Sequence, residues 1–135
     1  MTGARDLGFL LHNIEPKHIP GEYVFCSIDR ETLRALKDTP LLTFRESEGI
    51  AVIVSKEIAE KYQLSFDNTW GLITLSVHSD LEAVGFIAAV TKVLAESKIS
   101  VNVVSAYYHD HLFVPHTKVN DALNLLQAIS ESIKK

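Results

Sequence analysis

One order of predicted elements occurs twice along the chain. In the first half, residues 22–28, "EYVFCSI", are rich in β-branched and aromatic residues and predict a strand. A short helix, two apolar strands and a second short helix are predicted to follow, at residues 29–38, 40–44, 49–55 and 56–64. This order constrains the fold strongly, because strand–helix–strand–strand–helix is the order of the ferredoxin-like split βαβ arrangement.

The second half repeats the order after residues 65–71, "SFDNTWG". A strand, a long helix, two strands and a closing helix are predicted there, at residues 70–78, 79–98, 99–108, 111–115 and 117–135. In this arrangement an antiparallel sheet carries both helices on one face, and each copy can borrow a strand from the other. We therefore predict an α+β protein with two ferredoxin-like βαββαβ subdomains. A compressed one covers residues 21–68, a complete one covers residues 69–135, and residues 1–20 form an N-terminal extension.

The two helices of the second half differ in their apolar patterns. The closing helix has a single core-facing stripe at three- and four-residue spacing: Val119, Ala122, Leu123, Leu126, Ile129 and Ile133. The long helix is apolar around most of its circumference: Val84, Phe86, Ile87, Ala88, Ala89, Val90, Val93, Leu94 and Ala95. We expect the long helix to be buried on more than one side, against the first half of the chain or a second subunit.

Three residues of the first half fit helix starts and a turn. Asp29 and Ser55 precede the two short helices, where their side chains can accept from free N–H groups of the first turn. Gly49 suits the loop of a hairpin between the two apolar strands, because such a loop needs a residue that tolerates positive φ.

Composition narrows the classes of partner. The chain has 135 residues, 47% of them hydrophobic and 22% charged, which is enough to bury a core. Its net charge of −4 and scattered basic residues argue against nucleic acid as a partner.

The cysteine content and the apolar runs indicate a location. A single cysteine, Cys26, cannot form an internal disulfide and suits a reducing compartment. The N-terminal apolar run is too short for a signal peptide, and no segment suits a membrane span. We expect a soluble cytoplasmic protein without a membrane partner.

Several motifs carry a resemblance to a known family. They are Trp70 leading into a strand, Gly85 in the turn before the long helix, "SKISVNVVSAY", and "DHLFVP". The first half matches more loosely, through "GEYVFCSI" and "PLLTFRESEGIAVIV". On these residues the chain resembles the small tandem ACT-domain proteins, which are related to the cytosolic arginine-sensor (CASTOR) family.

The resemblance implies a function and a site. ACT domains are regulatory modules that bind amino acids or other small ligands, commonly where two domains lay their sheets side by side. Carried over by motif, the ligand-binding residues are those of the turn and of the following phrase: Asp80, Leu81, Ala83, Val84, Gly85, Ser105, Ala106, Tyr107 and Asp110. Two features depart from the family pattern. Ala106 stands where the family has threonine, and the turn contains the acidic Asp80 and Glu82.

The chemistry of such a site follows from its groups. Free N–H groups near Ala83 to Gly85, at the positive end of a helix dipole, can receive a carboxylate. Asp110 can pair with a ligand ammonium through charge-assisted hydrogen bonds. Each residue also has a simpler interpretation, because Asp favours turns between strands and Gly85 can mark close packing against another backbone.

Metal binding is an alternative for the same region. His109 and His111 share a face of an extended strand, with His116 or His78 as further ligands. Two ligands do not make a zinc site, so exposed or hydrogen-bonded histidines are the simpler interpretation. Tyr107 and Tyr108 can stack on a ligand or pack one in and one out.

Catalysis has no support in the sequence. Cys26 has no adjacent base, and the chain contains no G-x-S-x-G elbow and no glycine-rich phosphate loop after a strand. The sequence therefore predicts a non-catalytic protein without a cofactor. Its partner is a small molecule, with an amino acid as the first candidate. The alternative is a protein–protein association module, either a homodimer or a complex with another protein.

Overall fold

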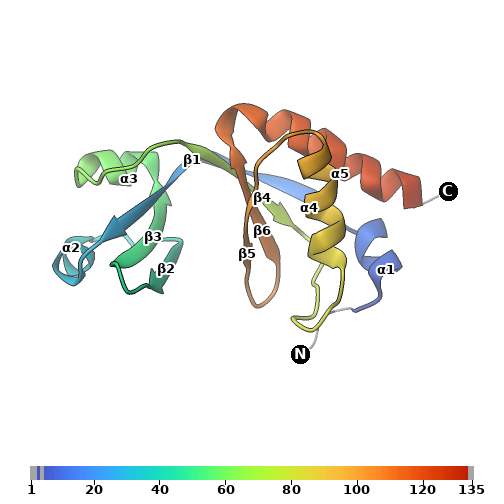
Figure 1. Ribbon diagram of the computed structural model, residues 1–135, viewed down its shortest axis with the longest axis horizontal. Coiled ribbons are helices and arrows are strands. Elements are labelled where there is room, and N and C mark those ends of the chain that lie inside the picture. Colours follow the sequence, from blue (N-terminus) through green and yellow to red (C-terminus); the bar gives the residue numbers. More distant parts are fainter. Residues whose placement is uncertain (1–2, 4, 134–135) are drawn as a thin grey trace. The chain divides into compact units, whose positions relative to one another are not determined.

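The computed structural model describes residue 3 and residues 5–133, with side chains described to residue 131 (Figure 1). The chain forms two compact units. Unit 1 contains the residues up to Pro20 and those from Gly71 onward, and unit 2 contains Gly21–Trp70. Strand β1 (Pro16–Ile28) begins in unit 1 and ends in unit 2.

In unit 1, four strands lie side by side in the order β1, β4, β6, β5. The last three are β4 (Trp70–Leu75), β6 (Asp110–Pro115) and β5 (Asn102–Ser105). The Ser76 N–H donates to the Glu15 carbonyl at 3.2 Å, so the start of β1 lies beside the end of β4. β5 and β6 are antiparallel, with Ser105 opposite Asp110 at the end of the hairpin. Unit 1 thus completes its sheet with the first part of β1.

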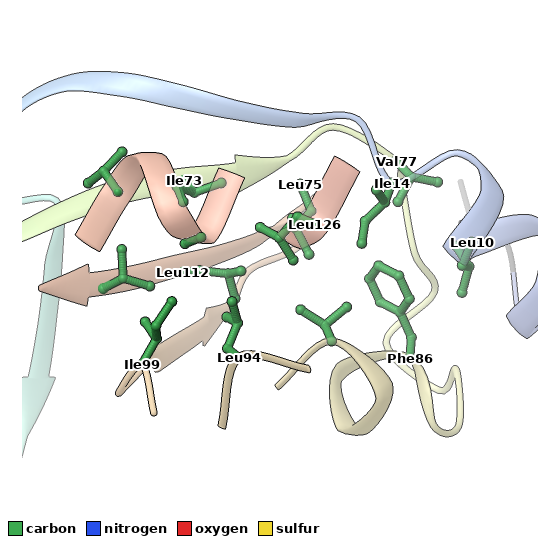
Figure 2. Close-up of a cluster of buried hydrophobic side chains, with 14 residues drawn as sticks. Leu10, Ile14, Ile73, Leu75, Val77, Phe86, Leu94, Ile99, Leu112 and Leu126 are labelled. Carbon is green, nitrogen blue, oxygen red and sulfur yellow. The ribbon is translucent and has the colours of Figure 1, made fainter. Parts of the chain in front are cut away.

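The core of unit 1 lies between this sheet and its helices. The helices are α1 (Leu7–His12), α4 (Phe86–Glu96), the short 3₁₀ helix η1 (His116–Lys118) and α5 (Val119–Ile133). Figure 2 shows Phe86 and Leu94 of α4 and Leu126 of α5 in one cluster with Leu75 and Leu112 of the sheet. The start of α5 packs tightly on β4, since a Cβ at Gly71 would lie 2.2 Å from Val119 Cγ2.

The first residues of the chain contribute to this core. Leu10 of α1 and Ile14 are fully buried in the cluster of unit 1 (Figure 2), and the Ser130 hydroxyl donates to the His12 carbonyl at 2.6 Å. The sequence assigned residues 1–20 to an extension, whereas the described part of that segment supplies a helix and a strand to unit 1.

Unit 2 has the same order of elements on a smaller scale. Its strands lie in the order β2, β3, β1, with all neighbours antiparallel. Its remaining elements are α2 (Arg30–Ala35), β2 (Leu42–Arg45), β3 (Ile50–Ser55) and α3 (Lys56–Lys61). Residues of one sheet face, including Val24, Cys26 and Val52, form its core with Leu33 of α2 and Ala59 of α3. Both helices therefore cover one face of the sheet.

The predicted helix starts of unit 2 are confirmed. Asp29 Oδ1 accepts from the Thr32 N–H at 2.7 Å, and Ser55 Oγ accepts from the Ile58 N–H at 3.2 Å. The predicted hairpin is also present, and a Cβ at Gly49 would lie 2.8 Å from Ser27 Oγ. The predicted α+β class, with antiparallel strands and helices on one face, is confirmed in both units.

Two predictions about unit 1 are wrong in detail, and a third is not met within the chain. The long helix begins at Phe86 rather than at residue 79, because Gly85 adopts a left-handed conformation with φ 88°. β5 ends at Ser105, because the Ala106 N–H donates to the His109 carbonyl at 3.0 Å and closes a turn. Within the chain, α4 is buried on one face only, through Phe86, Val90 and Leu94, while Ala88 and Ala95 are exposed, and burial of another side against a second subunit stays a prediction. The predicted stripe of α5 is buried or half-buried from Val119 to Ile129, and the Ile133 side chain lies outside the described residues.

Candidate functional site

The loop over residues 76–85 connects β4 to α4 and is organised by Asp80. The Asp80 side chain is nearly buried, and its Oδ1 accepts from the Glu82 N–H at 2.8 Å. The Asp80 carbonyl accepts from the Ala83 N–H at 2.9 Å. The prediction of a free N–H at Ala83 is therefore wrong. The Glu82 N–H, and to a smaller extent the positive charge of Arg5, lower the pKa of Asp80 although burial opposes them.

Asp110 is the first residue of β6 and the most enclosed carboxylate of the site. It shares a strand face with Leu112 and Val114, which point into the core of unit 1. Its exposed fraction is 5%, and its Oδ2 accepts from the Ser79 hydroxyl at 2.8 Å. Among the residues that the structure describes, none donates a hydrogen bond to Oδ1. Asp110 is thus a buried carboxylate with one oxygen available to a ligand.

The start of α4 has no side-chain cap. Gly85 occupies the N-cap position, and the first bond of the helix runs from the Ala89 N–H to the Gly85 carbonyl at 2.9 Å. Because the first N–H groups of a helix have no partner within it, those of α4 remain available for a ligand. The conformation of Gly85 explains why a glycine stands here, since a side chain at positive φ is strained. Close packing is not needed to explain it, because a Cβ would meet Leu7 Cδ2 only at 3.7 Å.

A cavity of about 140 Å³ joins these groups. Six of the nine predicted ligand residues line it: Asp80, Leu81, Ala83, Gly85, Ser105 and Asp110. The first turn of α4 and Ser79 complete the wall. Val84, Ala106 and Tyr107 are exposed and do not line this cavity, and their role in ligand binding stays a prediction. The cavity therefore brings a buried carboxylate and an uncapped helix start into one small space.

A second cavity of about 220 Å³ lies against the same loop. Its lining includes Gly3, Arg5, His78 and Tyr107, and it shares Ser79, Asp80 and Leu81 with the first cavity. Arg5 reaches two carboxylates here. Its Nε lies 3.4 Å from Asp80 Oδ1, and its Nη2 lies 2.5 Å from Glu82 Oε2. The acidic residues of the turn are thus paired with a cation from the start of the chain.

The histidines form ring contacts rather than a metal cluster. The rings of His109 and His111 are 6.4 Å apart, and the ring of Tyr108 contacts those of His78 and Tyr107. The described residues contain no group of three or more His, Cys, Asp or Glu placed to hold a metal ion. His111 Nδ1 lies 2.9 Å from Thr74 Oγ1. Burial and the charge of His109 lower the pKa of His111, while Asp110 opposes them.

Cys26 is buried in unit 2, and burial raises the pKa of its thiol. A raised thiol pKa leaves little of the nucleophilic thiolate at neutral pH. This environment is that of a structural cysteine in the core of unit 2.

Sequence reasoning did not identify three contributors to the site. Arg5 lies far from the loop in sequence, and no local pattern links it to Asp80 and Glu82. Ser79 adjoins the predicted turn, but its hydroxyl bonds to Asp110, which is far away in the sequence, so no local pattern identified it. The first turn of α4 was missed because the helix was expected to begin earlier.

Comparisons with known proteins agree with the fold. Family models described as "ACT domain" match residues 2–70 and residues 68–128. No curated protein matches the chain at a significant level. None of the described helices has the length and apolar character needed to cross a membrane.

Three solved structures illustrate the range of similarity. A Vibrio cholerae protein of unknown function, described as a possible transport protein, has 40% sequence identity and a TM-score of 0.81, over 92% of this chain and 95% of the other. A protein from Agrobacterium tumefaciens has 18% identity and a TM-score of 0.70, over 85% and 87%. The ligand-free regulatory subunit of aspartate kinase from Thermus thermophilus has 8% identity and a TM-score of 0.68, over 87% and 97%.

Proposed function

Because the chain belongs to the ACT-domain family and contains two such domains in tandem, we propose that it binds a small molecule as a non-catalytic regulatory protein. An amino acid is the first candidate for the ligand. The matched segments are ACT domains, and no catalytic domain is among the matches. The likeness to a regulatory subunit of aspartate kinase supports the fold on which this role depends.

One observation carries the proposal: a single cavity contains both the buried Asp110 and the uncapped start of α4. A free amino acid has an ammonium and a carboxylate on one carbon, so a site for it needs an acceptor and a donor close together. Asp110 Oδ1 accepts from the ammonium, and the free N–H groups of α4 donate to the carboxylate. Hydrogen bonds to charged groups contribute about 1.5–3 kcal/mol each.

The direct test is a thermal-shift screen of the twenty amino acids and related metabolites on the full chain. The proposed relation to the arginine sensors makes arginine an essential member of the panel. A ligand that raises the melting temperature is then titrated against Asp110→Asn, which keeps the shape of the side chain but removes its charge. We expect the affinity to fall at least about tenfold, corresponding to about 1.4 kcal/mol.

Asp67→Asn provides the matched control, because Asp67 is an exposed aspartate of unit 2. It should leave the affinity unchanged. A screen in which no compound stabilises the protein would contradict the proposal. So would a ligand that Asp110→Asn binds as tightly as the unmodified chain does.

A second candidate function is association, either of two copies or with another protein. It is favoured by the exposure of large apolar side chains around the site, with Val84 85% exposed, Leu81 66% and Tyr107 58%. A homodimer that covers these residues would place the cavity at an interface. Light scattering at tens of micromolar tests the association of two copies, which requires a dimer in solution and a shift toward monomer in Val84→Lys.

The proposed location is the cytoplasm. The support is chemical, since a buried, unpaired cysteine is compatible with a reducing compartment. Fluorescence microscopy of a tagged full chain in its native host tests this, and a signal confined to the cell periphery would contradict it.

A further inference from the structure

Gly3 lies directly on the loop that lines the candidate cavity. A Cβ at Gly3 would lie 2.7 Å from the His78 carbonyl oxygen and 2.8 Å from the Asp80 nitrogen, so only glycine allows this approach. Two residues later, Arg5 pairs with Asp80 and Glu82. Gly3 and the guanidinium of Arg5 thus both contact the loop that carries the two carboxylates.

These two carboxylates differ in environment. The Asp80 side chain is 7% exposed and lines both cavities, whereas that of Glu82 is 76% exposed. A charge interaction is stronger where water is excluded, so the pair with Asp80 matters more to the site than the pair with Glu82. Arg5 lines the second cavity and Asp110 lines the first, with Asp80 common to both. Arg5 thus compensates the negative charge of Asp80, and Asp110 remains as the buried carboxylate that can pair with a ligand.

We propose that Arg5 sets the charge class of the ligand: with Arg5 in place, the site takes a molecule with one ammonium group and disfavours one with a second. This inference rests on the proposed function above. A second ammonium that approached Asp80 would meet the positive charge of Arg5, and like charges placed together reduce affinity for the wrong ligand. Without Arg5, Asp80 and Asp110 are two uncompensated carboxylates on one cavity, which favours a ligand with two cationic groups.

L-Norleucine and L-lysine are a matched pair of probes, because they have the same chain length and lysine adds the ε-ammonium. Calorimetric titration of the full chain with each probe gives the ratio of the two dissociation constants. In the unmodified protein we expect norleucine to bind more tightly. In Arg5→Gln the preference for norleucine over lysine should fall at least about tenfold, whereas Arg5→Lys should keep it. Arg45→Gln, at an exposed arginine of unit 2, should leave the ratio unchanged.

A charge-restoring variant separates this role from a structural one. Replacing Asp80 by Asn in the Arg5→Gln background removes the carboxylate that Arg5 compensates, and the amide oxygen of Asn can still accept from the Glu82 N–H. If Arg5 acts through charge, the double variant should recover part of the original preference for norleucine. If Arg5 only holds the loop, the second substitution recovers nothing, and the inference is overturned. Melting temperatures of all variants establish that the compared proteins are folded.

The outcomes for the two proposals are distinct. Binding of norleucine with the same ratio in Arg5→Gln overturns the role of Arg5 and leaves the proposed function standing. Binding of lysine by Arg5→Gln alone, with neither probe bound by the unmodified chain and no hit in its ligand screen, contradicts the proposed function and, with it, the statement that the unmodified site takes a ligand with one ammonium group. Binding of neither probe by any variant overturns the role of Arg5.

Discussion

The two units share an order of elements but enter their first helices differently. In unit 2, Ile28 ends β1, Asp29 caps the helix, and Arg30 begins α2. In unit 1, Leu75 ends β4 and Phe86 begins α4, with the loop over residues 76–85 between them. The loop supplies Ser79 and Asp80 to the candidate cavity. A site at this position therefore depends on the loop, which the fold itself does not require.

The helix starts show the same contrast in their hydrogen bonds. Asp29 and Ser55 in unit 2 have extended backbones and bond to N–H groups of their own helices. Gly85 in unit 1 is left-handed and has no side chain to do so. A side-chain cap bonds to N–H groups of the first helical turn, whereas an uncapped helix leaves these N–H groups available to a ligand. Unit 1 therefore lacks a local stabilising contact at a place where a ligand can supply one.

The largest expected effect comes from the core that supports the site. Leu94 of α4 is fully buried in the extensive core of unit 1, so Leu94→Ala should lower the free energy of unfolding by about 2–5 kcal/mol. Val52→Ala in the smaller core of unit 2 removes fewer carbons and should cost less. Urea denaturation measures both, and a larger loss for Val52→Ala would contradict the contrast between the cores.

The next prediction concerns the start of α4, where the N-cap residue is left-handed. Gly85→Ala should lower the free energy of unfolding by about 1–2 kcal/mol, because a side chain is strained in the left-handed conformation. Gly8→Ala is the control within α1, where a Cβ would meet only Asp6 Oδ1 at 3.4 Å and alanine favours the helix. Thermal denaturation should show opposite shifts for the two variants. Equal shifts would show that the conformation of Gly85 is not strained for alanine.

A smaller effect on stability is expected at Ser55, which caps the start of α3 in unit 2. Ser55→Ala removes the acceptor for the Ile58 N–H and should lower the free energy of unfolding by about 1 kcal/mol. It should leave ligand affinity unchanged, because the proposed site lies in unit 1. Ser65→Ala, at an exposed loop position, serves as the control. Weaker ligand binding by a folded Ser55→Ala protein would break the assignment of the site to unit 1.

The smallest effect concerns pH. The pKa of His111 is below its ordinary value of about 6.5, so the unfolded chain takes up this proton more readily than the folded one. The stability from neutral His111 is full above about pH 6.5 and is lost as pH falls through the lower folded pKa. Denaturation between pH 7.5 and 5 should show a steeper decline for the unmodified protein than for His111→Gln. His18→Gln, at an exposed histidine of β1, should follow the unmodified protein.

Local patterns were sufficient for much of the fold. The alternation of strand-forming and helix-forming runs identified the two copies, and the short polar residues Asp29 and Ser55 identified two helix starts. The first part of β1 was missed because Pro16 and Pro20 disfavour a strand. A strand segment that pairs with another strand on one side only can nevertheless contain proline. The start of α4 was misplaced because the acidic turn reads as a helical first turn when the conformation of Gly85 is unknown.

The candidate site was also predicted only in part. Asp110 and the turn before α4 were identified from motifs, and the structure places them around one cavity. Tyr107 was predicted with them, but it lies beyond the end of β5 and lines the other cavity. Ala106 lies in the turn that closes the hairpin, so the methyl group at the position where the resemblance predicts threonine is exposed outside the cavity.

Local patterns in the sequence were enough to predict most of the elements, their order and the types of residue that line the candidate site, because these follow from short-range periodicity and local hydrogen bonding. Two features of the site became known from the folded structure alone: Asp110 is buried with one oxygen bonded to Ser79, and Arg5 pairs with Asp80 and Glu82. Burial and ion pairing between distant residues depend on how the chain packs. A charge at residue 5 can compensate a carboxylate at residue 80 only after folding has brought them together.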